Sequence, residues 1–129
     1  MRSLGSSCCT CLQSNLCTLD QHHEGAGVSN IVVTGASLDG SEQAIGLADR
    51  FEPLYATTGI HPHHSEQANA AGMQQIAALS RHPKVRAIGE TGLDYFRNFS
   101  PRDSQIAGFE RHIELAIETG LPMFLHERD

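Results

Sequence analysis

Side chains that could bind a metal or move a proton gather at three places, each at the end of an apolar run. They are His61 and His63 in "GIHPHHSE", Glu90 and Asp94 in "AIGETGLDYF", and His126 and Arg128 in "MFLHERD". Imidazole and carboxylate groups are common ligands of divalent cations, and both also serve in proton transfer. The spacing therefore raises the hypothesis of one site assembled from distant segments.

Glu90 is the residue in this set with the clearest need for a partner. It follows a short apolar run, and an isolated buried carboxylate is costly. Gly89 and Gly92 stand beside it, and glycine lets a backbone or a ligand approach closely. A divalent metal would meet the need of Glu90, and Arg128 would meet it as an ion-pair partner.

His126 lies one α–β unit after Glu90, at the equivalent end of the next predicted strand. Neighbouring parallel strands would hold the carboxylate and the imidazole side by side, which is about half of a divalent site. A hydrogen-bonded Glu–His pair that closes the edge of the sheet is the alternative, and the residues alone leave both open.

Two loops at the same edge carry further candidates. His61 and His63 could bind phosphate, transfer a proton or ligate a metal, while His64 is expected to face solvent. The stretch "YFRNFSPR" alternates aromatic residues with Arg97 and Arg102, which suits a single nucleic-acid strand. Its aromatic rings could equally pack down on the rim of the fold.

The segments that must position these residues alternate between strand and helix patterns. Strands are predicted at 28–37, 54–62, 85–92 and 121–127, and helical patterns at 41–51 and 66–82. A third helix is predicted from an N-cap at Ser100 to Gly120. The apolar stripe of this third helix consists of Ile106, Phe109, Ile113, Ala116 and Ile117. The β-α-β-α-β-α-β order indicates parallel strands whose carboxyl ends share one edge, where ligand sites form in barrels and open sheets.

Composition limits the class of protein. The chain has 129 residues, 40% of them hydrophobic, and a formal charge of −6. This length allows one domain, and the negative charge disfavours a protein that coats duplex nucleic acid, although a bound cation would reverse the local sign. No apolar run approaches the roughly 18 residues of a membrane span, and the N-terminus is a poor secretory signal, so we expect a cytoplasmic protein.

The N-terminal segment differs from the rest of the chain. All four cysteines lie within its first 17 residues. Cys8 and Cys11 have the C-x2-C spacing, and His22 and His23 follow, so a small zinc site is one reading. Reduced thiols on a flexible tail are the other. We predict a divergent, poorly ordered segment over residues 1–24 and a folded domain over residues 25–129.

The motifs "GIHPHHS", "VRAIGETGLDYFRNFSPRDSQ" and "LPMFLHERD" resemble, in order and spacing, the TatD family of metal-dependent deoxyribonucleases. The resemblance implies a TIM-type (β/α) barrel of the metal-dependent hydrolase kind, with divalent ions, magnesium above all, at its C-terminal face. It implies a metal-ligand role for Glu90 and His126. It also implies catalytic roles for His61, His63 and Asp94, and substrate contacts for Arg97 and Arg128.

The implied reaction is hydrolysis of DNA, single-stranded DNA included, with exonuclease character, and no obligate protein partner is expected. A barrel needs about 250 residues, so we expect about half of one here, with the remaining ligands beyond residue 129 and little activity in the isolated chain. The alternatives are a non-catalytic truncated product and a related metal hydrolase acting on a small amide or ester. The aromatic–arginine loop favours a polynucleotide over the small substrate.

Overall fold

The computed structural model describes residues 27–129. The cysteine cluster, the zinc reading and the predicted disorder of residues 1–24 lie outside the described residues, and the domain boundary near residue 25 stays a prediction. One compact unit spans Val32–Asp129, and the elements of the site belong to it.

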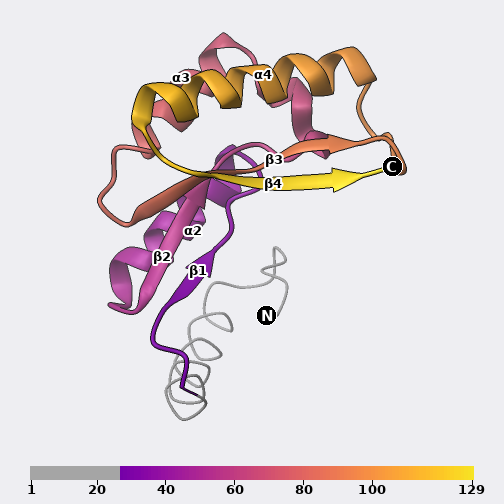
Figure 1. Ribbon diagram of the computed structural model, residues 1–129. Coiled ribbons are helices and arrows are strands. Elements are labelled where there is room, and N and C mark those ends of the chain that lie inside the picture. Colours follow the sequence, from indigo (N-terminus) through magenta and orange to yellow (C-terminus); the bar gives the residue numbers. More distant parts are fainter. Residues whose placement is uncertain (1–26) are drawn as a thin grey trace. The chain divides into compact units, whose positions relative to one another are not determined.

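Strands and helices alternate along the described chain (Figure 1). They are β1 (Ile31–Val33), α2 (Leu38–Arg50), β2 (Leu54–Thr58), the 3-10 helix η1 (Pro62–Gln67), α3 (Ala70–Leu79), β3 (Val85–Asp94), α4 (Arg102–Thr119) and β4 (Met123–Arg128). The strands form one sheet in the order β1-β2-β3-β4, and the β2–β3 and β3–β4 pairs are parallel. The prediction of about half of a TIM-type barrel is confirmed.

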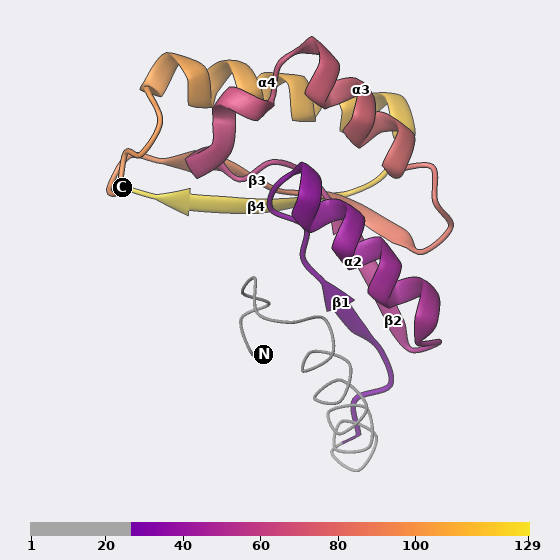
Figure 2. The same cartoon turned by 180° about the vertical axis from the view of Figure 1, so that it is seen from behind.

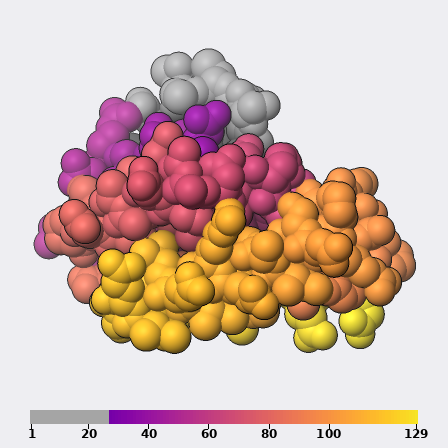
Figure 3. All heavy atoms as spheres, turned by 90° about the horizontal axis from the view of Figure 1, so that it is seen from above, coloured from indigo at the N-terminus to yellow at the C-terminus, as the bar shows by residue number. Residues whose placement is uncertain are grey.

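The helices cover the outer side of the strands. In Figures 1 and 2, α3 and α4 lie along the same side of β3 and β4, and α2 runs beside β2. Seen from above, the atoms of α3 and α4 adjoin one another on the visible face (Figure 3). Between these layers the core is aliphatic, with Ile60, Ile76, Ile88 and Leu115 buried. No described helix combines the length and apolar character required to cross a membrane.

The first two helices differ from the predicted ranges because polar side chains set their ends. Helix α2 begins at Leu38 rather than Ser41, since the hydroxyl of Ser37 accepts a hydrogen bond from the Gly40 N–H at 3.0 Å. The segment predicted as one helix over residues 66–82 is divided. There the side chain of Asn69 caps α3, and η1 precedes it.

Two predictions for α4 are wrong. Pro101 is its N-cap and makes no side-chain bond, while the Ser100 hydroxyl donates to the carbonyl oxygen of His63 at 3.2 Å. The predicted apolar stripe is also wrong for its three isoleucines, because Ile106, Ile113 and Ile117 are exposed, while Ala116 is buried as predicted. The residues of α4 that are buried are Gln105, Gly108, His112, Leu115 and Ala116. The predicted end at Gly120 is confirmed, with φ at 73° in the left-handed region.

Gly92 brings β3 into close contact with β4. Its φ is 145°, a conformation that residues with side chains rarely adopt. A Cβ atom at this position would collide with the carbonyl oxygen of His126. The absence of a side chain therefore serves the approach of a neighbouring strand.

We expect Gly92→Ala to lower the free energy of unfolding by about 2–4 kcal/mol, because strain and a backbone collision add. Urea denaturation of the two proteins measures the difference. Gly46→Ala is the matched control. Gly46 lies in α2 with open space around it, so alanine there should raise stability by up to about 1 kcal/mol. Equal stability of wild type and Gly92→Ala would contradict the packing of β3 on β4.

Candidate metal centre

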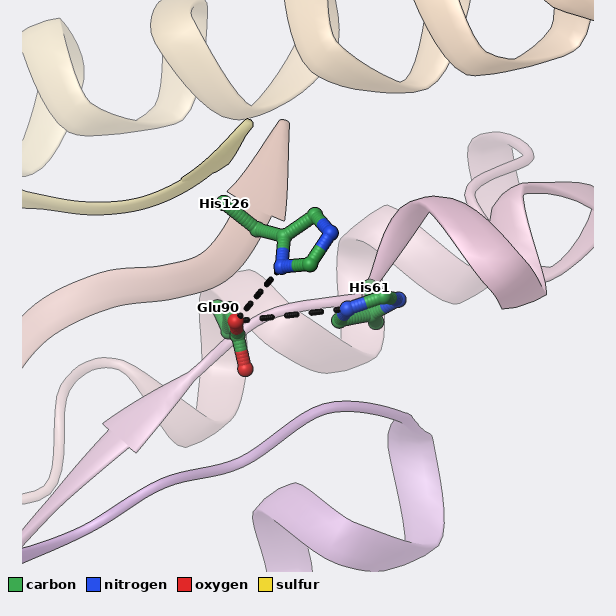
Figure 4. Close-up of side chains that lie close together, drawn as sticks. All are labelled: His61, Glu90 and His126. Carbon is green, nitrogen blue, oxygen red and sulfur yellow. Dashed lines mark hydrogen bonds and ion pairs between the residues drawn. The ribbon is translucent and has the colours of Figure 1, made fainter. Parts of the chain in front are cut away.

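Three side chains from different elements converge at the carboxyl ends of the strands (Figure 4). Glu90 lies in β3, His126 lies in β4, and His61 is the residue that immediately precedes η1. One ligand atom of each lies within 4.8 Å of the others. Glu90 Oε1 is 3.1 Å from His126 Nδ1 and 3.9 Å from His61 Nε2. The expected meeting of Glu90 and His126 at one edge is thus present.

A β-bulge aims Glu90 into this cluster. Gly89 pairs with Phe124 and Thr91 with Leu125, so Glu90 is the extra residue between two ladder positions. Its backbone N–H donates instead to the carbonyl oxygen of Gly35, which follows β1, at 2.8 Å. Bulges of this kind redirect a side chain without ending the strand.

Asp94 lies behind the cluster and fixes two imidazole rings. A single oxygen, Oδ2, lies 2.9 Å from His63 Nε2 and 3.0 Å from His126 Nε2. Oδ1 accepts from the backbone N–H of Arg97 at 2.9 Å. This bond from Arg97, and then those from His63 and His126, hold the pKa of Asp94 well below its usual range. The carboxylate is therefore ionised and accepts from both rings.

This arrangement leaves two acceptors facing each other. When neutral His126 donates its Nε2–H to Asp94, its Nδ1 carries a lone pair. That lone pair faces Glu90 Oε1 at 3.1 Å. Two such atoms repel unless a cation or a proton lies between them. Imidazole nitrogen and carboxylate oxygen form a suitable pair of donors for a divalent ion, and a second carboxylate that orients the ligating ring is usual in metal sites. Glu90, His126 and Asp94 therefore have the chemistry of a site for a divalent metal ion.

His61 has the protonation of a hydrogen-bond donor and not that of a metal ligand. Its Nδ1 accepts from the backbone N–H of His63 at 3.1 Å, so in the neutral ring the proton is on Nε2. Burial, with His63 and His126 close by, lowers the pKa of His61 to about 4. Nε2 therefore presents an N–H donor beside Glu90 near neutral pH. This tautomer suits a hydrogen bond to a phosphate oxygen or to water better than it suits metal ligation.

The other predicted site residues occupy the rim. His63 stacks edge-on against His61, with ring centroids 4.2 Å apart, and His64 is exposed as expected. Arg97 is exposed. Arg128 lies over the ring of Phe96, 4.6 Å from its centroid, so the alternative of an Arg128–Glu90 ion pair is wrong. Asp94 is 0% exposed. That burial favours an orienting role, while its predicted catalytic role is untested.

Sequence reasoning missed two buried anchors on α4. Gln105 accepts from the Asp94 N–H at 2.8 Å and donates to the Ser100 carbonyl oxygen at 2.8 Å. His112 Nε2 accepts from the Ile60 N–H at 3.0 Å, next to His61. Burial lowers the pKa of His112, which keeps its ring neutral. Gln105 and His112 are seven residues apart, which places them on the same face of α4. The isoleucines on the other face are more hydrophobic, and they led the sequence analysis to predict that face as the buried one.

Comparison with known proteins adds independent evidence. The family described as TatD related DNase matches residues 16–129. The chain is 47% identical over 104 residues to the "3'-5' ssDNA/RNA exonuclease TatD" of Enterobacter lignolyticus, and 41% identical over 104 residues to that of Escherichia coli. These alignments cover 81% of this chain and 40% of each relative, so the chain spans well under half of the length of these proteins.

Solved structures agree with the sequence comparison. A TatD homologue from Escherichia coli superposes with a TM-score of 0.80 at 32% identity, covering 89% of this chain and 45% of that one. A hydrolase of the TatD family from Entamoeba histolytica gives 0.76 at 31% identity, covering 84% and 40%. An uncharacterized amidohydrolase from Saccharomyces cerevisiae gives 0.62 at 26% identity, covering 79% and 38%.

We expect Asp94→Asn to weaken binding of Mn²⁺ by about 10- to 100-fold, because a neutral amide cannot accept from both imidazole rings as the carboxylate does. Isothermal titration calorimetry measures the affinity, and circular dichroism checks the fold. Asp103→Asn, at an exposed position in the first turn of α4, should bind as wild type does. An unchanged dissociation constant for Asp94→Asn would contradict the orienting role.

Stability should fall in mild acid. The folded state resists protonation of His61 until about pH 4, whereas the unfolded chain binds that proton near pH 6.5. The free energy of unfolding is therefore highest above pH 6.5 and declines as the pH falls towards 4. At pH 5 the loss from His61 alone is about 2 kcal/mol. Buried His112 adds to the loss in the same direction.

Urea denaturation in EDTA at pH 7.5 and pH 5 tests this expectation. His112→Gln should show a smaller loss, because it removes one of the two titrating rings. His64→Gln changes an exposed ring and serves as the control, with the loss of wild type. Equal stability of the wild-type chain at both pH values would show that the buried rings do not govern its acid sensitivity.

Proposed function

The chain belongs to the TatD related DNase family, and from this premise we propose that it is part of a metal-dependent nuclease that hydrolyses phosphodiester bonds in single-stranded DNA. The relatives named as 3'-5' exonucleases acting on ssDNA and RNA support digestion from the 3′ end. The observation that carries the proposal is the pair of facing acceptors, His126 Nδ1 and Glu90 Oε1, 3.1 Å apart.

In this proposal Glu90 and His126 hold a divalent ion. When bound, such an ion polarises a phosphoryl oxygen and lowers the pKa of a coordinated water. Asp94 keeps the Nε2 proton of His126 in place, so that Nδ1 faces outward with its lone pair. His61 donates its Nε2–H to an oxygen of the scissile phosphate; burial keeps the ring neutral, and the bond from the His63 N–H to Nδ1 keeps its one proton on Nε2.

The remaining rim residues are assigned to the substrate. His63 is held by Asp94 through Nε2 and leaves its Nδ1 as an acceptor for a proton at the reacting phosphate. Arg97 and Arg128 are exposed and would contact the phosphates of the strand. Magnesium as the ion, the cytoplasm as the compartment and the absence of an obligate protein partner complete the proposal.

A metal hydrolase of small amides or esters is the second candidate. The structural likeness to the yeast amidohydrolase supports it. The loop over residues 95–102 argues for the nuclease instead, since exposed rings and guanidinium groups suit a long polyanion better than a small neutral substrate. A non-catalytic protein is the third outcome that the experiment below can return.

A chimera provides the test. The 104 matched residues of this chain replace the corresponding segment of the Enterobacter lignolyticus exonuclease, which supplies the rest of the protein. We expect the chimera to digest single-stranded DNA in the presence of magnesium. Digestion should cease when EDTA removes the divalent ion. Glu90→Ala should lower its rate at least about 100-fold, because the change removes a ligand, and should leave its melting temperature unchanged because it removes no core contact. Gel electrophoresis of a 5′-labelled oligonucleotide follows the reaction.

Two comparisons complete the experiment. Glu110→Ala, at an exposed position of α4, should keep the rate of the parent chimera. The isolated 129-residue chain should digest the oligonucleotide negligibly, since Glu90 and His126 are only part of a divalent shell. Full activity of the Glu90→Ala chimera would refute the ligand assignment, and hydrolysis of a small amide but not of DNA would favour the second candidate.

A further inference from the structure

Two phenylalanine rings stand in solvent beside the candidate metal centre. Phe96 is 64% exposed and Phe99 is 65% exposed, on the loop that joins β3 to α4. Rings left in water forgo the stabilisation that burial would provide. Both lie in the stretch for which the sequence left open whether the aromatics pack down on the rim, and these two do not pack down.

The loop that carries the rings is held at both ends. The backbone N–H groups of Arg97 and Asn98 donate to Asp94, at 2.9 Å to its side chain and 3.2 Å to its carbonyl oxygen. At the far end of the loop, the side chain of Gln105 donates to the carbonyl oxygen of Ser100. The hydroxyl of Ser100 donates to the carbonyl oxygen of His63. The rings are therefore presented by a fixed backbone, which lowers the entropy lost on binding.

Phe99 is linked to the cluster by a line of rings. Its centroid is 4.8 Å from that of His63, in an edge-on arrangement. His63 in turn is 4.2 Å from His61, whose Nε2 lies 3.9 Å from Glu90. In this arrangement Phe99 remains 65% exposed, so ring surface is left free for a ligand. A nucleotide with its phosphate at His61 and Glu90 would bring its base to this ring.

The charges around the rings match a nucleic-acid strand. Residues 95–102 contain Arg97 and Arg102 and no acidic residue, although the whole chain has a formal charge of −6. The guanidinium of Arg128 lies over Phe96. Alternating aromatic and basic side chains bind unpaired strands through base stacking and phosphate contacts.

We propose that Phe99 stacks on the unpaired base of the nucleotide held at the candidate metal centre, and that Phe96 with Arg128 receives a neighbouring base. The inference rests on the proposed function and adds a determinant of substrate class to it. Stacking on Phe99 tolerates any base but requires one that is free of its duplex partner. The ring therefore selects single strands at the reacting nucleotide.

Binding of abasic oligonucleotides tests the proposal. Short 5′-fluorescein-labelled single strands carry one abasic residue at successive positions from the 3′ end. Their affinity for the 129-residue chain is measured by fluorescence anisotropy with magnesium, and electrophoresis verifies that they remain intact. For wild type, we expect one abasic position near the 3′ end to weaken binding by roughly five- to a hundred-fold. Phe99→Ala should abolish this discrimination, and Phe99→Trp should retain it.

Ile117→Ala is the control, since it truncates a 77% exposed side chain in the last turn of α4 and should keep the discrimination of wild type. Equal binding of intact and abasic strands by wild type, or unchanged discrimination in Phe99→Ala, would overturn the stacking role while leaving the nuclease proposal standing. Failure of the wild-type chain to bind any single strand would overturn the stacking role in this chain, while the nuclease proposal is decided separately by the chimera.

Discussion

The buried carboxylate of Asp94 accepts hydrogen bonds from His63, His126 and the backbone N–H of Arg97, and the geometry of the site follows from these three bonds. The bond to His126 fixes which ring nitrogen is free to face Glu90. The bond to His63 sets the position of the ring against which Phe99 lies. The bond from Arg97 begins the loop that presents the aromatic residues. A buried charge with this many donors is satisfied, and a neutral replacement would leave several of them without an equivalent acceptor.

A backbone irregularity within β3 places Glu90 opposite His126. The bulge gives Glu90 no ladder partner on β4, and its N–H bonds to Gly35 instead. Gly92 allows β4 to approach where any side chain would collide with the His126 carbonyl oxygen. Glu90 Oε1 and His126 Nδ1 thus lie 3.1 Å apart for two reasons. The strands β3 and β4 are close together, and their pairing shifts by one residue at the bulge.

Helix α4 supports the site from behind while turning an apolar face outward. Its buried side includes Gln105 and His112, which bond to the backbone of Asp94 and of Ile60. Ile106, Ile113 and Ile117 are exposed on it. The helix therefore gives up apolar burial in the described structure in order to satisfy two backbone groups close to the site. Each such backbone group, left unpaired in the interior, would cost about 1–3 kcal/mol.

The sequence by itself determined the alternation of strands and helices, the parallel topology, and the presence of Glu90 and His126 at one edge. These features follow from apolar periodicity and from the shared direction of parallel strands, both of which are local or topological. It did not determine which face of α4 is buried, because periodicity counts apolar residues and cannot see that Gln105 and His112 find partners on other elements. Nor did it determine that Ser100 bonds to the His63 carbonyl oxygen rather than capping α4. The bulge at Glu90, the proton positions on His63 and His126, and the exposure of Phe99 were likewise decided by tertiary structure, since each depends on atoms that are distant in the chain.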